Sequence, residues 1–252
     1  AVKWDLGVNF SLNRSKVLVL SEDKDIFGGE LDNTILKDQL NLMRVGEPMY
    51  VFYGYVEDGY DENGHIVYKN MDDDPAITAA DKTIIGDPNP DFLVNLTTAV
   101  SYKGFTLSAF FQSSIGNDIY SLSMAAQAYD YGYNGNTLRE VYYNHWTPEN
   151  PTAKYPNLDQ TSYKMSDRFV YDGSFVRLKN LELAYDVPCA RNKFIKRARV
   201  YVSAQNLFTI TSYPFWDPDI NANGGGSSMI QGVDSYCYPS ARTYTIGCRL
   251  TF

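Results

Sequence analysis

The first residues whose types and spacing suggest chemistry lie in an acidic segment. Asn70, Asp72 and Asp74 alternate with other residues, and Asp81 follows seven positions later. Counted from Asn70 they stand at positions 1, 3, 5 and 12, which is the spacing of oxygen ligands in an EF-hand calcium loop. Pro75 replaces the glycine of the sharp turn, and position 12 is Asp rather than a bidentate Glu. The spacing predicts a calcium site at these four residues, with a solvated acidic loop without metal as the alternative.

A second candidate site consists of aromatic side chains in segments without strand pattern: Trp146, Tyr213, Trp216 and Tyr236. The chain is rich in such residues, with 21 Tyr and 13 Phe. Flat rings beside Asn and Asp stack on sugars or hold a peptide, and Tyr and Trp are also enriched where proteins meet. We therefore expect these four residues to contact a substrate or a protein lid, and packing among the loops is the open alternative.

Catalysis and nucleic-acid binding have little support in the sequence. His65 and His145 are far apart, and neither a Gly-x-Ser-x-Gly nor a His-Glu-x-x-His pattern occurs. The carboxylate pair of a glycosidase cannot be identified from sequence alone. The net charge is −8 and no basic run is present, which argues against a nucleic-acid partner. We predict that the chain is not an enzyme.

The elements that position these residues are strands with alternating apolar and polar side chains. Period-two alternation predicts two-faced β-strands over residues 2–12, 93–102, 105–115, 175–187, 200–208 and 244–252. Lys103-Gly104 predicts a tight hairpin turn. The alternation changes parity between Leu178 and Leu181, which predicts a bulge near Lys179-Asn180. No run of 18 apolar residues occurs, so the sequence contains no transmembrane helix.

The lengths of the connections indicate an architecture. Short turns at 103–104 and 188–197 alternate with long segments at 57–91, 116–173 and 211–240. Short turns at one end and long loops at the other are typical of outer-membrane barrels, so we predict an all-β, antiparallel transmembrane β-barrel segment. Residues 49–56 are predicted as a further strand, while residues 14–43 fit neither a short turn nor a clear element. A soluble, secreted carbohydrate-binding β-sandwich is the alternative fold.

The last strand carries a further signal. Thr245, Gly247, Leu250 and Phe252 stand at the positions of the terminal assembly signal that outer-membrane barrels present to the barrel assembly machinery. In such a barrel the terminal aromatic lies at the membrane interface, here with the carboxy-terminus in the periplasm. The chain opens at Ala1 directly inside an alternating strand, and we interpret residues 1–252 as one carboxy-terminal part of a longer protein.

Several motifs together resemble the carboxy-terminal region of SusC/RagA-like TonB-linked outer-membrane receptors. They include Phe52-Tyr-Gly-Tyr-Val-Glu-Asp-Gly59, Ile85-Gly-Asp-Pro-Asn-Pro-Asp-Phe92, Gln112-Ser-Ser-Ile-Gly-Asn-Asp-Ile-Tyr120, Trp146-Thr-Pro-Glu-Asn150 and Ser203-Ala-Gln-Asn-Leu-Phe208. Members of this family often carry a more complete calcium-type motif at the place of the acidic segment.

The resemblance implies a 22-stranded barrel in the Gram-negative outer membrane, of which this chain would supply about seven or eight strands. It also implies import of oligosaccharides or peptides, a SusD-like surface lipoprotein as a lid, and an amino-terminal plug and barrel region that lies outside this chain and contacts TonB.

Overall fold

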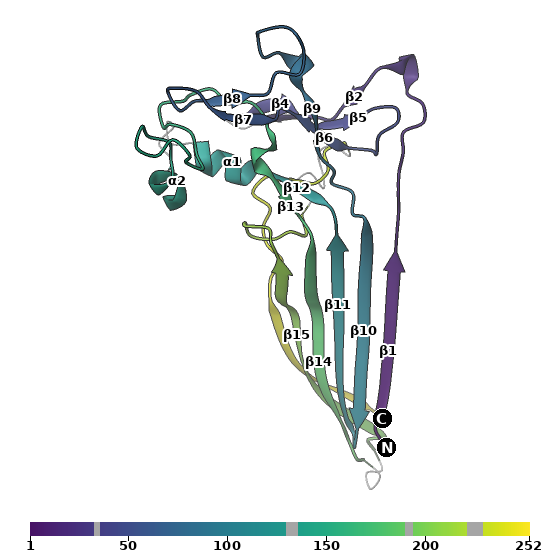
Figure 1. Ribbon diagram of the computed structural model, residues 1–252. Coiled ribbons are helices and arrows are strands. Elements are labelled where there is room, and N and C mark those ends of the chain that lie inside the picture. Colours follow the sequence, from purple (N-terminus) through teal and green to yellow (C-terminus); the bar gives the residue numbers. More distant parts are fainter. Residues whose placement is uncertain (33–35, 130–135, 190–193, 221–228) are drawn as a thin grey trace.

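The chain folds into one tall sheet of long strands with a cap of short elements at one end (Figure 1). The computed structural model describes residues 1–32, 36–129, 136–189, 194–220 and 229–252. Both chain termini lie at the end of the sheet that is far from the cap, which we call the lower end. The cap is built from the three long excursions of the chain, residues 12–91, 116–174 and 212–242.

The long sheet has six strands in the described residues, in the order β1-β10-β11-β14-β15-β17, and every neighbouring pair is antiparallel. The strands are β1 (Lys3–Ser11), β10 (Phe92–Tyr102), β11 (Phe105–Ile115), β14 (Phe175–Val187), β15 (Arg197–Thr211) and β17 (Thr243–Thr251). The predicted alternating strands are therefore confirmed to within a few residues, and the fold is mainly antiparallel β. β1 and β17 form the two edges of this sheet and each pairs with one strand in the described part of the chain.

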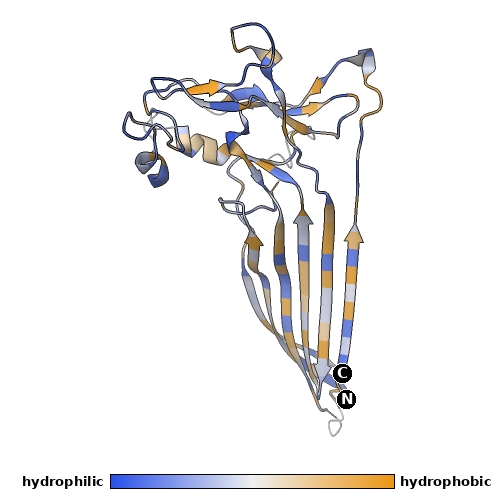
Figure 2. Ribbon diagram, viewed as in Figure 1, coloured by the Kyte–Doolittle hydropathy of each residue, from blue (hydrophilic) through white to orange (hydrophobic). Residues whose placement is uncertain are grey.

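One face of the long sheet is apolar across all six strands. The register places the following side chains in one row: Trp4, Val100, Leu107, Leu183, Val202 and Ile246. These side chains are all exposed, from 41% at Val100 to 84% at Ile246. Figure 2 shows the alternation as orange and blue bands along β1 and β10. Because successive side chains of a strand point to opposite faces, the polar residues gather on the other face.

Two local features set the register of the sheet. Lys103 and Gly104 both have positive φ, of 49° and 88°, as a two-residue hairpin turn matching the strand twist requires. The β11–β14 and β14–β15 ladders shift register beside Lys179, between Leu178 and Asn180 in the second ladder. This confirms the predicted bulge, which keeps Leu178 and Leu181 on the same apolar face despite their different parity.

The predicted strand at 49–56 does not belong to the long sheet. Its core forms β6 (Val51–Gly54), which pairs with other short strands in the cap. Residues 12–91 are therefore one excursion between β1 and β10, and no short turn is needed within 14–43, of which residues 33–35 lie outside the described residues. The long sheet has six strands rather than seven or eight in the described part, and all its long connections lie at the cap end (Figure 1).

In the described residues, the cap contains four small sheets and two α-helices. Its strands are β2 (Ile26–Phe27), β3 (Glu30–Asp32), β4 (Lys37–Gln39), β5 (Asn41–Met43), β6, β7 (Glu57–Tyr60), β8 (Ile66–Tyr68), β9 (Thr83–Gly86), β12 (Asp118–Ser121), β13 (Val170–Asp172) and β16 (Val233–Asp234). Its helices are α1 (Leu122–Tyr129) and α2 (Arg139–Tyr143). The Leu, Met and Ala residues of α1 favour a helix and are buried in the cap interior.

The hydrophobic core lies in the cap and not on the sheet. Its cluster of buried residues takes side chains from all three excursions, including Phe52, Tyr120, Phe169 and Val233. The three excursions also pair directly, since β12 is antiparallel to β13 and parallel to β16. The cap is thus a single folded unit with its own core, whereas the apolar face of the sheet is uncovered.

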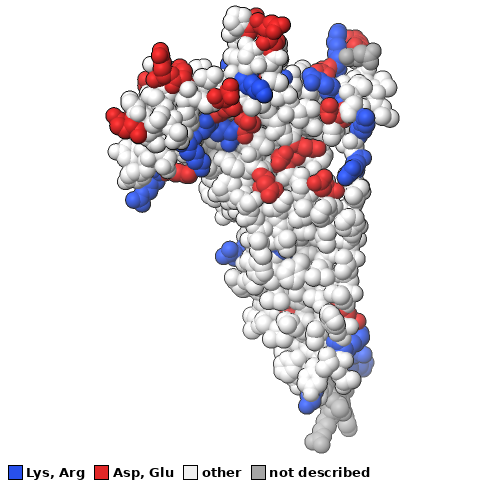
Figure 3. Space-filling view, in the orientation of Figure 1, with Lys and Arg blue, Asp and Glu red and all other residues white. Residues whose placement is uncertain are grey.

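Charged residues are separated along the molecule. Figure 3 shows many acidic and basic side chains on the cap, a band on the sheet with almost none, and a further group at the lower end. Side chains without charge on a mid-height band are what a hydrocarbon layer requires. None of the helices in the described ranges has the length and apolar character needed to cross a bilayer.

Candidate functional site

The acidic segment forms a series of tight turns. Asn70 Oδ1 accepts from Asp72 N–H at 3.1 Å, Asp72 Oδ1 accepts from Asp74 N–H at 2.8 Å, and Asp74 Oδ1 accepts from Ala76 N–H at 3.0 Å. Such side-chain-to-backbone bonds stabilise turns without any ligand. The three residues lie close together on the exposed surface of the cap, as their spacing predicts.

Asp81, the fourth predicted ligand, is fully buried. Its carboxylate accepts from Met71 N–H and Thr78 N–H, both at 2.7 Å, and with Thr78 it forms a capping box on a short 3₁₀ turn, Ala79–Asp81. These hydrogen bonds hold the pKa of Asp81 below its usual value. In the described residues, no group of three or more His, Cys, Asp or Glu is placed to hold a metal ion. Calcium binding stays a prediction, and it requires these carboxylates to move together.

The four predicted aromatic contact residues have different environments. Tyr213 is 4% exposed, and its hydroxyl donates to Asp234 Oδ2 at 2.6 Å. Burial, followed by this hydrogen bond, raises the pKa of Tyr213. Tyr213 therefore packs inside the cap and is not available to a partner, which corrects its expected contact role. Trp146 is half-buried, and its ring covers the backbone of Gly64, where a Cβ would lie 2.3 Å from the ring.

Trp216 and Tyr236 remain candidates for contact with another molecule. They are 57% and 52% exposed. Trp216 stacks on Phe215 with ring centroids 4.8 Å apart and an interplanar angle of 16°. Both belong to the third excursion, at the base of the cap. A stacked aromatic pair with one open face has the shape that binds a sugar ring or a partner side chain.

Arg177 is the main residue that sequence reasoning missed. It lies on β14 with a side chain that is 2% exposed, and its guanidinium pairs with Asp217 and, at 3.3 Å, with Asp219. It also donates to Thr209 Oγ1 at 2.9 Å and to Ser240 Oγ at 3.1 Å. Arg177 thereby fastens both arms of the third excursion to the polar face of the sheet. An arginine in an alternating strand gives no signal of such burial, because its acidic partners are about 40 residues away along the chain.

The surroundings of the Asp217 carboxylate favour its charged form, which the ion pair with Arg177 requires. Burial alone would raise its pKa, but hydrogen bonds from the N–H groups of Ser240 and Asp219 and the charge of Arg177 outweigh burial and lower the pKa. The site is thus a charged pair with satisfied hydrogen bonds, which is the form in which buried ions are tolerated.

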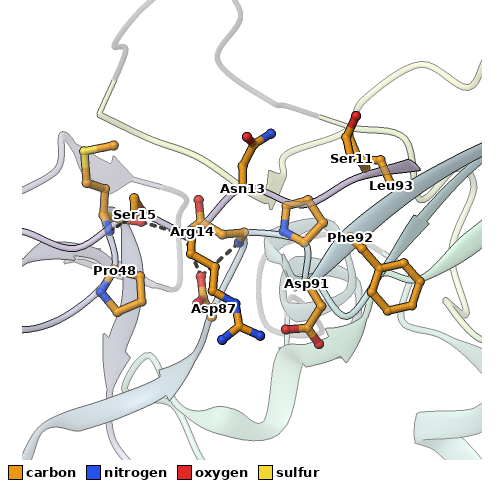
Figure 4. A pocket seen from close by; sticks show the side chains of 12 residues that line it. Ser11, Asn13, Arg14, Ser15, Pro48, Asp87, Asp91, Phe92 and Leu93 are labelled. Carbon is orange, nitrogen blue, oxygen red and sulfur yellow. Dashed lines mark hydrogen bonds between the residues drawn. The ribbon is translucent and has the colours of Figure 1, made fainter. Parts of the chain in front are cut away.

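A cavity of about 530 Å³ lies where the upper ends of β1 and β10 meet the cap. Figure 4 shows Arg14 together with two carboxylates, Asp87 and Asp91, around this space. Asp87 is held by neighbours, since its N–H donates to Asp118 Oδ2 at 2.8 Å. The lining is mixed polar and apolar, and it lies beside the open edge of β1.

The two histidines do not form a shared site. His65 Nε2 lies 2.8 Å from Asp159 Oδ1, and His145 Nδ1 lies 2.8 Å from the carbonyl oxygen of Tyr142. The first hydrogen bond joins two distant segments of the cap, and the second is a local bond to α2. The arrangement gives the histidines a structural role.

The predicted assembly residues lie on β17 and just beyond it. Thr245 and Gly247 are on the polar face, Leu250 and Phe252 belong to the apolar face, and Phe252 is 71% exposed. Position 247 requires a glycine because the ring of Tyr201 lies across it. A Cβ there would stand 2.5 Å from the Tyr201 hydroxyl. β17 is an edge strand, which leaves one side of its backbone open to a further strand.

No protein-family model matches the chain, but comparison with individual known proteins finds relatives of one kind, the TonB-dependent receptors. The chain is 32% identical over 270 residues to TonB-dependent receptor P3 of Formosa agariphila, covering 99% of this chain and 27% of that protein. It is 28% identical to the TonB-dependent receptor SusC of Bacteroides thetaiotaomicron, covering 99% of this chain and 24% of SusC. Among solved structures, the RagAB peptide transporter matches with a TM-score of 0.80 and 25% identity, over 100% of this chain and 27% of the matched chain.

These comparisons confirm the resemblance that the motifs indicated. They extend over nearly the whole of this chain and over about a quarter of each relative. The relatives are receptors and transporters rather than enzymes, in keeping with the expectation from the sequence. By sequence and by fold, the chain is a relative of the SusC/RagA-like TonB-dependent receptors, and it corresponds to about a quarter of such a receptor.

Proposed function

We propose that this chain is the carboxy-terminal part of a TonB-dependent outer-membrane transporter that imports oligosaccharides or peptides. Its six long strands form part of the barrel wall, with the apolar face towards lipid and the polar face towards the lumen. The cap forms the extracellular loops. The rest of the receptor supplies the remaining strands of a 22-stranded barrel, the plug and the segment that contacts TonB.

The uncovered apolar face is the observation that carries this proposal. A β-sandwich buries such a face against a second sheet. Here Leu107, Leu183 and Val202 in the centre of the sheet are 47%, 44% and 48% exposed. An exposed apolar face of this extent on a soluble protein would be an aggregation hazard, whereas in a membrane barrel it meets lipid.

Growth of the source bacterium tests the transport function. Deleting the codons for this chain from the full receptor gene should abolish growth on one nutrient class, supplied either as oligosaccharides or as peptides in place of monosaccharides or amino acids. Growth on the monomers serves as the control. Unimpaired growth on every oligomeric nutrient that the parent strain uses would contradict the proposal.

A surface lipoprotein of the SusD type is the proposed partner of the cap, and Trp216 is a proposed contact with that lid or with substrate. Trp216→Ala in the full receptor should weaken binding of the lipoprotein or of the nutrient by about thirtyfold, since tryptophans buried at interfaces often contribute about 2 kcal/mol or more. Tyr142→Ala, also an exposed aromatic of the cap at 62%, is the matched control. If both readouts stay at the parental level, Trp216 has neither role.

Calcium binding by Asn70, Asp72, Asp74 and Asp81 is proposed as a property of the acidic segment. Isothermal titration of the purified full receptor should show binding at calcium concentrations up to about the millimolar range, as for extracellular calcium modules. Asp72→Ala should remove that heat. Because the Asp72 side chain is exposed, the substitution should affect only the local turn in which Asp72 Oδ1 accepts from Asp74 N–H. If no binding heat is seen at millimolar calcium, the acidic segment does not bind calcium, and its side chains serve only to form turns.

Phe252 is proposed as the end of the signal read by the barrel assembly machinery. Removing Phe252 from the full receptor should reduce the amount of folded barrel in the outer membrane several-fold, seen as loss of the heat-modifiable band on gels. Affinity of the remaining folded receptor for nutrient should be unchanged, because Phe252 lies at the lower end, far from the cap. Normal insertion of the shortened receptor would remove the assembly role.

A further inference from the structure

A group of basic side chains lies at the lower end of β15 and β17. Lys196, Arg197, Arg199 and Arg249 line a cavity of about 490 Å³ together with Asp186 and three other residues. We call these four cations the basic rim. It stands out because the chain as a whole carries a net charge of −8. No part of the mechanism proposed above uses these residues.

The register of the sheet concentrates charge of one sign. Arg199 on β15 stands directly opposite Arg249 on β17, and Arg197 stands opposite Thr251. Like charges directly opposite each other in a strand pair are destabilising. Anionic groups close to the two arginines would offset this repulsion.

Two acidic side chains in the described part of the chain lie beside the basic rim, and both pair with the same arginine. Arg199 lies 3.3 Å from Glu182 and 3.5 Å from Asp186. Within the described residues, Lys196, Arg197 and Arg249 have no carboxylate at ion-pair distance.

The three arginines belong to the polar face of the sheet. Arg197, Arg199 and Arg249 alternate with Ala198, Val200 and Cys248, which lie on the apolar face. Under the proposed function, on which this inference rests, the polar face is enclosed by the barrel wall and the apolar face meets lipid. The group that compensates the arginines is therefore reached from the lumen side and not from the membrane.

We propose that an acidic segment of polypeptide from the part of the receptor outside this chain docks on the basic rim. The four cations exceed the two carboxylates Glu182 and Asp186 by two positive charges, spread from Lys196 to β17, which fits a segment with two Asp or Glu side chains. Arginine suits pairing with a carboxylate because its planar guanidinium group can donate two parallel hydrogen bonds to the two carboxylate oxygens. Since the chain covers about a quarter of its relatives, most of such a receptor is available to supply this segment.

Site-specific photo-crosslinking in the full receptor tests the proposal. A benzophenone amino acid replaces Thr251, which lines the cavity on the polar face, or Val200, which is 45% exposed on the apolar face of β15. After irradiation of outer membranes, the Thr251 probe should capture a peptide of the same receptor containing at least two Asp or Glu residues within about one loop length. The Val200 probe should capture phospholipid.

Charge variants show whether the captured segment depends on the basic rim. The double variant Arg197→Gln and Arg249→Gln should reduce capture at Thr251 at least fivefold, and raising the salt concentration on the unaltered receptor should reduce it in the same direction. Lys103→Gln, at the other turn of the lower end, is the control and should leave capture unchanged.

The outcomes separate this inference from the proposed function. Capture at Thr251 of phospholipid, of a segment without acidic residues or of nothing would overturn the docking proposal, as would capture that is insensitive to the double variant and to salt. Capture of protein instead of lipid at Val200 would contradict the membrane orientation itself. A gel shift on heating confirms that each variant contains a folded barrel, and the salt titration needs no variant.

Discussion

Replacing Arg177 by Met should destabilise the full receptor by about 3–5 kcal/mol and release the third excursion from the sheet. Removing one member of a buried ion pair costs this much because the other charge stays buried without compensation. The remaining charge here is the carboxylate of Asp217, whose side chain is 6% exposed. Methionine fills a similar volume, so the loss comes from charge and hydrogen bonds rather than from a cavity.

The measurement is urea unfolding of the detergent-solubilised receptor, followed by tryptophan fluorescence and by the gel shift of the folded barrel. Limited proteolysis should cut the variant within 212–242 much faster than the parent protein. Lys179→Met is the matched control: Lys179 lies two residues away, is 37% exposed and is 3.9 Å from Asp219. Pairs of this exposed kind contribute about 0–1 kcal/mol, so the control should be nearly neutral.

A second substitution isolates the cause. Asp217→Asn added to Arg177→Met removes the uncompensated charge and should recover a substantial part of the lost stability. If the double variant is as unstable as the sum of the single variants, the pair does not act as a unit and the explanation by burial of charge is wrong.

Replacing Leu107 by Arg should hinder stable insertion of the receptor and cost about 1–2 kcal/mol, between the costs of about 2–4 kcal/mol at the bilayer midplane and about 0–1 kcal/mol near an interface. Leu107 is the third residue of β11 and lies in the apolar row between Val100 and Leu183. Ser108→Arg is a close control, because the neighbouring residue points to the polar face, where Ser108 stands opposite Glu182. The control should assemble normally.

Outer-membrane fractionation and the heat-modifiable gel band measure the outcome. Equal tolerance of arginine at Leu107 and Ser108 would show that the apolar face does not meet lipid, and it would return the β-sandwich to consideration. The comparison does not depend on the identity of the nutrient or of the lid.

The long sheet could be predicted from sequence because its signal is local. Each strand alternates over nine or more residues, and the parity change beside Lys179 marks the bulge directly. The hairpin turn at Lys103-Gly104 needs only the two residues that form it. Where a single face must be apolar over a whole strand, the pattern repeats often enough to define both the strand and its faces.

The cap could not be predicted in the same way. Its strands have two to four residues, too short for alternation to be visible, and their pairing depends on distant partners. β12 pairs with β13 about 50 residues later and with β16 more than 110 residues later. The aromatic run at 49–56 resembled a barrel strand because β6 is buried on both sides in the cap, with Val51 and Phe52 almost fully covered.

In the candidate site, too, features that depend on neighbouring residues could be predicted and features that depend on distant segments could not. The acidic spacing from Asn70 to Asp81 predicts a calcium site, which stays a prediction, while the Asx hydrogen bonds of this segment need only neighbouring residues. Residue type alone could not separate Tyr213 from Trp216: both are aromatic loop residues, but one is buried against Asp234 and the other is open. Burial of a loop residue is decided by segments that are remote in sequence.

The joining of the three excursions in one cap has a consequence for how receptors of this kind diversify. Asn41 of the first excursion donates to the carbonyl oxygen of Gln231 in the third at 3.0 Å, and Tyr55 of the first bridges to Ser166 of the second. A recombination event that exchanged one excursion alone would leave the other two with a broken core. An exchange of all three excursions together would keep these contacts and the core of the cap intact.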